Sequence, residues 1–292
     1  MPMPTDIGVV DTMVGFPHPD MKEVYRFITR QTKDTESKEK FDFPVEYMFK
    51  DGTGKSLEGS DDPVGVTLRE MDVWGIERGL IGVGDPTGIS DEALKRHPDR
   101  FIPSSSFDPN EGMAGIRKLV EEYETYGVRA VGVFPAGVVP QVPINDKKMY
   151  PIYAKCVELG VSVWVNAGVP VPRLRYECQY PGLIDEVMYD FPDLVYVMMH
   201  GAEPWTDLAV KLMLKYPGLH YATSAFAPKY YPKDIVDYAN TRGGDKVLYA
   251  GYFPMGLSLE RIVAELHDVA FRDHVWEKFL RDNARRVLGL DG

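Results

Sequence analysis

The sequence lacks the features that define several common classes of protein. It has only two cysteines, Cys156 and Cys178, which are too few for a disulfide framework or a zinc site built from cysteine pairs. No run of about 18 apolar residues occurs, and no basic segment precedes an apolar stretch at the N-terminus. We therefore expect reduced thiols, no membrane span, no signal peptide and a cytoplasmic location.

Positive charge is also in short supply. The 33 lysines and arginines are outnumbered by 44 aspartates and glutamates, which gives a net charge of −11 and a pI near 5.1. Such a surface repels phosphate backbones and anionic lipid, so we expect neither nucleic acid nor a membrane as a partner. With 44% hydrophobic residues, the chain has enough apolar side chains for a full core.

Several catalytic motifs are missing. Gly54-Lys55-Ser56 lacks the earlier glycine of a phosphate-binding loop, because Phe49 stands at that position. No serine lies in a Gly-x-Ser-x-Gly context, which argues against a serine hydrolase of that type. No two of the six histidines are spaced as His-x-His or His-x-x-x-His, the usual ways for one element to supply two metal ligands.

The pattern that is present is an alternation of short β-branched runs with segments of helical period. This alternation is typical of a parallel sheet covered by helices, and eight such units predict a (β/α)8 TIM barrel that forms a single domain over residues 1–292. The expected strands are Ile7–Val14, Gly79–Val83, Phe101–Ser105, Ala130–Phe134, Ser162–Val165, Leu194–Met199, His220–Thr223 and Lys246–Tyr249.

Two regions depart from the simple repeat. Residues 31–62 follow the first strand with a mixed-charge run, an aromatic stretch and a Gly/Ser-rich piece. Because an insertion at this place emerges at the C-terminal mouth of the barrel, we expect a lid or a subunit interface there. After the last strand, Ser258–His267 and Phe271–Leu288 predict C-terminal helices, the second of them packed against the barrel exterior.

Four residues are candidates for chemistry because they interrupt or end predicted strands. His200 ends an apolar run, where barrel enzymes place working residues, although a core histidine is the alternative. Asp11 interrupts the first strand, where a carboxylate needs a partner; a purely structural pair would also satisfy it. Asn166 and Tyr252 follow later strands and are expected in the pocket wall.

Several stretches together resemble a known family. They are 68–79, 189–194 leading to His200-Gly201, 216–224, and 247–254 followed by Asn283-Ala284. The chain resembles the amidohydrolase superfamily, in its aminocarboxymuconate semialdehyde decarboxylase branch. The resemblance implies a metal-binding (β/α)8 barrel with a carboxylate and His-x-His on strand one, histidines ending strands five and six, and an aspartate after strand eight.

Most of that metal set is replaced in this sequence. Met13 and Gly15 stand where His-x-His belongs, Asn166 replaces the strand-five histidine, and Tyr252 replaces the last aspartate. A thioether, a hydrogen, a carboxamide and a phenol are poor ligands for Zn²⁺ or Mn²⁺. We therefore predict a degenerate metal site with no bound metal and no other cofactor.

The resemblance leaves His200 and Asp11 as candidate catalytic residues. The expected walls of the pocket are the side chains at the ends of the strands: Met13, Phe134, Asn166, Ser224 and Tyr252.

Three hypotheses follow for function. In the first, the chain is a non-catalytic accessory subunit that forms a homodimer or a hetero-oligomer with a related, metal-competent amidohydrolase subunit. In the second, it is a metal-independent hydrolase or decarboxylase that acts on a small carboxylated substrate, with His200 as acid or base and Asp11 orienting it. In the third, it is a small-molecule binding protein that has kept the pocket and lost the chemistry.

Overall fold

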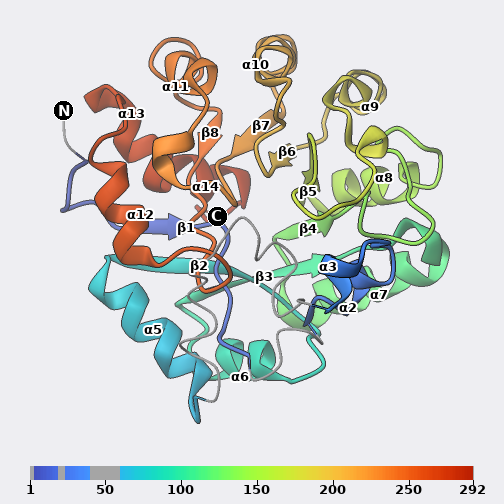
Figure 1. Cartoon of the computed structure of the whole chain (residues 1–292), viewed down its shortest axis with the longest axis horizontal. Helices are drawn as coiled ribbons and strands as arrows, with labels where there is room; N and C mark the ends of the chain where they lie inside the picture. Colours follow the sequence, from blue (N-terminus) through green and yellow to red (C-terminus); the bar gives the residue numbers. More distant parts are fainter. Residues whose placement is uncertain (1–2, 19–23, 40–59, 292) are drawn as a thin grey trace.

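Eight parallel strands form one curled sheet in the order of the sequence. The computed structural model describes residues 3–18, 24–39 and 60–291. Every neighbouring pair from β1 to β8 runs parallel, and the helices lie around the outside of the strands (Figure 1). The predicted (β/α)8 fold is confirmed. The strands are β1 Val9–Asp11, β2 Ile76–Gly82, β3 Phe101–Ser106, β4 Ala130–Val133, β5 Ser162–Asn166, β6 Tyr196–Met199, β7 Leu219–Ala222 and β8 Val247–Leu248.

The sheet is closed by contacts just beyond the ends of β8 and β1. Thr12 donates from its amide and its hydroxyl to the carbonyl of Tyr249, at 3.3 and 2.7 Å. Gly15 donates to Phe253 at 2.8 Å, and an isolated parallel bridge joins Val14 to Phe253. These bonds bring the first and the eighth strand together at the C-terminal end of the barrel.

Several helices begin and end at residues that typically cap helices. Asp62 accepts from the amide of Gly65 and caps α5, while Gly127 and Gly160 end α7 and α8 in the left-handed conformation. Within the described segments, no helix has the length and apolarity to cross a membrane. The helices are α2 Arg26–Thr29, α3 Thr35–Glu39, α5 Pro63–Val73, α6 Ile89–Arg96, α7 Met113–Tyr126, α8 Tyr150–Leu159, α9 Ile184–Asp190, α10 Thr206–Lys215, α11 Lys233–Ala239, α12 Leu259–Leu266, α13 Asp273–Glu277 and α14 Asn283–Val287.

Two aspartates lie close to helix starts. The carboxylate of Asp85 accepts from the amide of Ser90 in the first turn of α6, which begins at Ile89. Asp146 holds a turn before α8 by accepting from the amide of Lys148, and α8 begins at Tyr150. Short aspartate turns and helix caps share one hydrogen-bond pattern.

The barrel interior is filled by one apolar layer and closed at the floor by α14. Each strand contributes one buried side chain to the layer, and Ala284, Val287 and Leu288 pack against it from below. The C-terminal helix therefore packs against the outside of the barrel at its floor. The layer consists of Val10, Leu80, Ile102, Ala130, Trp164, Val197, Ala222 and Leu248.

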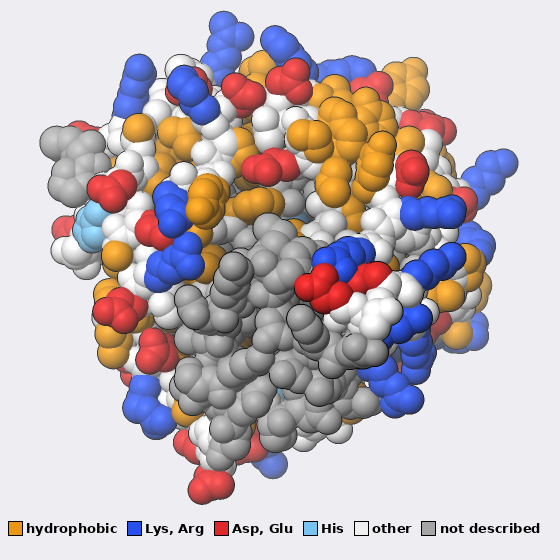
Figure 2. Space-filling view, in the orientation of Figure 1, with side chains coloured by type: hydrophobic (Ala, Val, Ile, Leu, Met, Phe, Trp, Pro, Cys, Tyr) orange, Lys and Arg blue, Asp and Glu red, His pale blue; other side chains and the backbone are white. Residues whose placement is uncertain are grey.

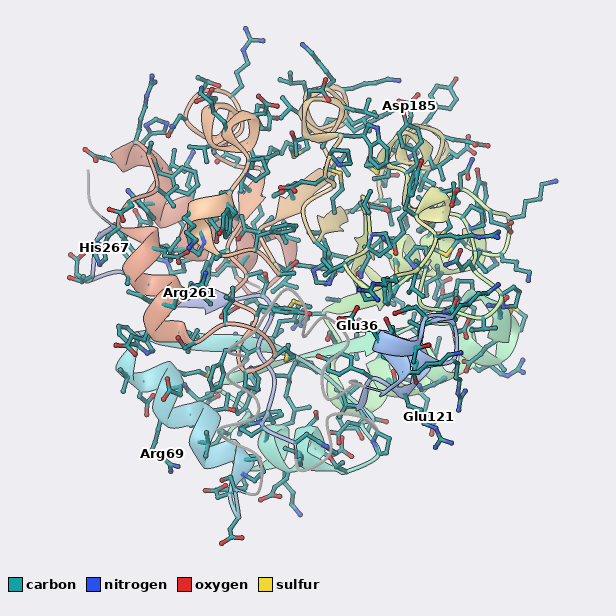
Figure 3. The ribbon with its side chains drawn as sticks, in the orientation of Figure 1. Glu36, Arg69, Glu121, Asp185, Arg261 and His267 are labelled. Carbon is teal, nitrogen blue, oxygen red and sulfur yellow. The ribbon has the colours of Figure 1, made fainter. Side chains whose placement is uncertain are left out.

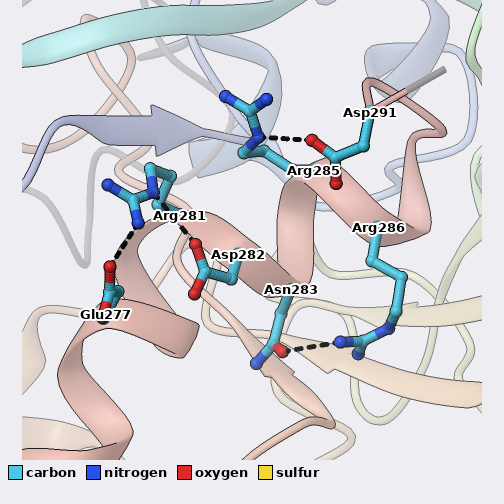
Figure 4. Close-up of polar contacts among 7 residues, drawn as sticks. All are labelled: Glu277, Arg281, Asp282, Asn283, Arg285, Arg286 and Asp291. Carbon is cyan, nitrogen blue, oxygen red and sulfur yellow. Dashed lines mark hydrogen bonds and ion pairs between the residues drawn. The ribbon is translucent and has the colours of Figure 1, made fainter.

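Polar contacts fix α14 in this place. The fully buried amide of Asn283 donates to the carbonyls of Gly244 and Val247, at 2.8 and 2.9 Å, at the start of β8. Arg286 donates to Asn283 at 3.3 Å, and Arg285 pairs with Asp291 at 2.6 Å (Figure 4). The floor is thus closed by a side chain whose donors are satisfied.

The predicted lid over residues 31–62 is only partly described, because residues 40–59 lie outside the described part of the chain. Its first residues do meet the barrel. Gln31 donates to the carbonyls of Ala136 and Gly137, at 3.1 and 2.8 Å, beyond the end of β4. Arg173 pairs with Asp34, which precedes α3, and with Glu36 on α3, the latter at 2.6 Å; Figure 3 labels Glu36 on that helix.

Candidate functional site

A cavity of about 630 Å³ opens at the C-terminal ends of the strands. This is the end at which TIM-barrel enzymes carry their active sites, and the volume is typical of a pocket for a small molecule. On the face shown in Figure 2, hydrophobic side chains gather at the upper right, over the segment between β5 and α9 that holds exposed Val169, Tyr176 and Tyr180. The cavity therefore opens beside an apolar surface.

Five of the seven predicted site residues line this cavity. Met13, Phe134, Asn166, His200 and Tyr252 come from the ends of β1, β4, β5, β6 and β8. Their placement follows from the topology, since parallel strands present all their carboxyl ends at one edge. The other five histidines do not line the cavity, and Figure 3 shows His267 at the outer edge of the molecule.

His200 is held from behind by Ser224. The Ser224 hydroxyl accepts from the His200 amide at 3.1 Å and lies 3.1 Å from the ring nitrogen Nδ1. On its other side the ring meets Tyr252 edge to face, with centroids 5.9 Å apart. Burial lowers the pKa of His200 to about 4, so the imidazole is neutral at pH 7.

The backbone at the site adopts left-handed conformations. His200, Ala225 and Tyr252 have φ of 59°, 70° and 74°, and all three line the cavity. A non-glycine residue in this region costs about 1 kcal/mol or more, and such residues are common at functional sites. The turns after β6, β7 and β8 thus keep a strained geometry that aims side chains into the cavity.

Ser224 was expected in the wall of the pocket, but the structure places it behind the wall. It is fully buried and does not line the cavity. Its only hydrogen-bond partner within the described residues is His200. It lies two residues beyond the end of β7, and the chain turns there so that its hydroxyl faces the neighbouring strand rather than the mouth.

Asp11 was expected to orient His200, and this contact is also corrected. One carboxylate oxygen, Oδ1, accepts from the amides of Gly251 and Met13, at 2.8 and 2.9 Å, and so joins β1 to the chain after β8. The other, Oδ2, is buried without a described partner. Burial raises the pKa of Asp11 to about 7, against the lowering effect of both amides. A Cβ at Gly251 would lie 2.3 Å from Oδ2, so only glycine fits there.

The donors at this site do not fit the metal of the family that the sequence resembles. Over residues 3–18, 24–39 and 60–291, no group of three or more His, Cys, Asp or Glu side chains is arranged to hold a metal ion. The positions at the mouth carry a thioether at Met13, a carboxamide at Asn166 and a phenol at Tyr252. Burial raises the pKa of Tyr252 to about 12, so this phenol keeps its proton at neutral pH and is a weak ligand.

Sequence reasoning missed one wall of the cavity. Tyr25, Phe27, Ile28 and Arg30, on and beside α2, all line it. The Arg30 guanidinium makes no ion pair with any described residue. The signal was present in the sequence, because these residues lie where the chain leaves β1 at the mouth, but no periodic pattern distinguishes them from a loop.

A model of the amidohydrolase family matches residues 61–290. The chain belongs to the amidohydrolase family. The match includes seven of the eight strands and the floor helix, so the resemblance drawn from the sequence motifs is confirmed for the family. A search of curated proteins finds no match for the chain.

Solved structures with this amidohydrolase fold cover nearly the whole chain. An uncharacterised TIM-barrel protein from Bordetella bronchiseptica has a TM-score of 0.75 at 23% identity, covering 97% of this chain and 99% of that one. A manganese-bound 5-carboxyvanillate decarboxylase from Novosphingobium aromaticivorans has a TM-score of 0.68 at 14% identity, covering 98% of both chains. A 2,6-dihydroxybenzoate decarboxylase from Rhizobium has a TM-score of 0.61 at 16% identity, covering 98% of this chain and 100% of that one. At these identities the likeness establishes the fold alone.

Proposed function

We propose that this amidohydrolase-family chain is a metal-independent carboxy-lyase that acts on a small aromatic carboxylate in the cavity at the mouth of the barrel. The observation that carries the proposal is the composition of the cavity wall. Aromatic and aliphatic side chains such as Phe27, Phe134 and Met199 make up most of it, and polar groups are few. Such a wall suits a flat apolar ring with one or two polar substituents.

Arg30 supplies the recognition of the carboxylate in this proposal. Its guanidinium lines the cavity and has no described ion-pair partner, and its planar set of donors matches the two oxygens of a carboxylate. The proposal also accords with the fold, because two of the structural relatives are decarboxylases of hydroxylated aromatic acids by their names.

The reaction breaks the bond between the ring and the carboxylate carbon and releases CO₂, and the electron pair of that bond takes a proton from water onto the ring carbon. Charge moves onto the ring oxygens during this change, so hydrogen-bond donors at those oxygens stabilise it. Tyr252 keeps its hydroxyl proton because burial raises its pKa to about 12, and His200 and Asn166 add polar groups to the same wall. A hydrolase would instead need a side chain that takes a proton from a water molecule, and Asp108 is the one carboxylate among the described residues of the wall.

The experiment is a turnover assay on chelator-treated protein with 2,6-dihydroxybenzoate and 5-carboxyvanillate, following CO₂ release. We expect turnover to survive the chelator and to fall by about a factor of 100 or more in His200→Ala. His267→Ala, at the outer edge of the molecule, is the matched control and should keep the wild-type rate.

Other outcomes would contradict the proposal in different ways. A rise in melting temperature without conversion would favour the binding protein. No binding together with co-purification of a related barrel would favour the accessory subunit, a role for which no described residue provides support.

A further inference from the structure

Ser224 and His200 form a buried pair whose hydrogen atoms can be assigned from geometry. The Ser224 hydroxyl is fully buried, and its oxygen already accepts from the His200 amide at 3.1 Å. The second contact of this oxygen is with the ring nitrogen Nδ1 of His200, also at 3.1 Å. A serine hydroxyl has one hydrogen to donate, and a neutral imidazole has one nitrogen that donates and one that accepts.

Two arrangements of this contact differ in what they leave unsatisfied. If Nδ1 carries the proton, it donates to Ser224, and the serine hydrogen then has no acceptor among the described residues. If the serine donates to Nδ1, every donor of the pair is used. A buried donor without an acceptor is disfavoured by a factor on the order of ten or more, so the second arrangement prevails.

The remaining ring nitrogen, Nε2, then carries the proton. It makes no hydrogen bond to a described residue. It is also not one of the described side-chain atoms that are buried without a hydrogen-bond partner. Because His200 lines the cavity, this nitrogen is open to the cavity. The low pKa of about 4 keeps the ring neutral, so Nε2 presents an N–H group and no lone pair.

We propose that Ser224 is a positioning residue that fixes His200 as a neutral Nε2–H hydrogen-bond donor toward the ligand, rather than as a general base. The inference rests on the proposed function only in that a carboxylate or phenolic oxygen is the acceptor. The same hydroxyl also holds the His200 amide, and so supports the left-handed backbone at φ 59° that turns the ring toward the cavity. One side chain thus fixes both the direction of the ring and its tautomer.

The test is the ¹⁵N spectrum of the histidine rings in the uniformly labelled full-length chain at pH 7, with His200 assigned by its loss in His200→Gln. We expect the Nε2–H tautomer, with Nδ1 shifted as an acceptor of a hydrogen bond. Addition of benzoate should move the Nε2–H resonance downfield. A ring protonated at Nδ1 in the wild-type spectrum overturns the inference, whether or not the protein turns over any substrate.

Variants separate positioning from general stability. Ser224→Ala should move the ¹⁵N chemical shift of Nδ1 toward that of a ring nitrogen that accepts no hydrogen bond, and should make the Nδ1–H tautomer detectable. It should also lower kcat about tenfold, with a smaller change in KM. Ser224→Thr keeps the hydroxyl and should restore the wild-type spectrum. The matched control is Ser162→Ala, which also loses one accepted bond, from Trp164, and one donated bond, to Arg129, at a buried serine outside the cavity wall.

The outcomes for this inference and for the proposed function are distinguishable. An unchanged His200 spectrum in Ser224→Ala contradicts the positioning role even if the enzyme is active. The predicted spectra without any turnover uphold the positioning of His200 and contradict only the carboxy-lyase activity.

Discussion

The floor and the mouth of the barrel are built from the same eight strands, yet it is at the mouth that a ring nitrogen opens to a cavity. At the floor, Asn283 donates both amide hydrogens to carbonyls near β8. At the mouth, Nε2 of His200 is open to the cavity. Buried polar atoms without a described partner do not separate the two ends, because Arg78 Nε and His220 Nδ1, near the arginines of α14, share this condition with Asp11 Oδ2.

The backbone shows the same contrast. Four non-glycine residues of the described chain have positive φ, and all four lie in the turns that follow β6, β7 and β8. They are His200, Ala202, Ala225 and Tyr252. The floor has stability without strain, whereas the mouth gives up some stability for geometry, as expected of a functional site.

The largest effect is expected at Asp11, where the free energy of unfolding should depend on pH. Its folded pKa of about 7 lies above the unfolded value of 3.8, so its contribution to stability is complete below pH 4 and is lost as the pH rises through 7. Asp11→Asn, which resembles the protonated form, should be more stable than wild type at pH 8 by up to about 4 kcal/mol. The two proteins should match near pH 4.

Urea unfolding at pH 4, 6 and 8 measures this difference. Asp193→Asn, an exposed aspartate, controls for the change in net charge and should leave the pH profile unchanged. Parallel profiles for wild type and Asp11→Asn would show that the carboxylate is not destabilised by its burial.

For His200, the dependence of stability on pH should have the opposite sign to that of Asp11. Its folded pKa of about 4 lies below the usual 6.5, so its contribution is present above pH 6.5 and is lost as the pH falls through 4. His200→Gln should remove about 3 kcal/mol of acid sensitivity between these values. Chemical unfolding at pH 4.5 and 7 checks this prediction, and an equal loss of stability in both proteins would contradict it.

At the floor, Asn283→Ala should cost about 2 kcal/mol at every pH, because the buried carbonyl of Val247 and the half-buried carbonyl of Gly244 lose their donor. Benzoate affinity should not change, since Asn283 does not line the cavity. Thermal unfolding and calorimetric titration measure the two quantities, with Asn145→Ala, which loses one exposed hydrogen bond to Glu186, as control. A loss of affinity as large as the loss of stability would break the distinction between floor and mouth.

The smallest effect is expected at Arg173, which joins the loop after β5 to α3. Its pairs with Asp34 and Glu36 are exposed to solvent, so Arg173→Ala should lower stability only slightly. Because α2 forms part of the cavity wall, the dissociation constant for benzoate should rise by up to about fivefold. Titration with benzoate in low and high salt measures this change. An effect that is independent of salt would show that the ion pairs of Arg173 are not its cause.

The sequence was sufficient to predict the eight strands because most of them are short apolar runs, several rich in β-branched residues, between turn signals. It also placed His200, Asn166 and Tyr252 correctly, since residues at the ends of parallel strands must meet at one edge. Their partners were not predictable in this way. The bond between Ser224 and His200 joins the turns that follow β7 and β6, which are far apart in the sequence. The apolar face of α14 does not indicate which part of the barrel exterior it covers.

The central claim is that the mouth of this barrel holds an organised His200 site, while its described residues offer no set of ligands for a catalytic metal. The most direct test is calorimetric titration of the chelator-treated protein with Mn²⁺ and Zn²⁺, with His200→Ala in parallel. The account predicts no stoichiometric binding that depends on His200. Binding of one metal ion per chain that His200→Ala abolishes would contradict it.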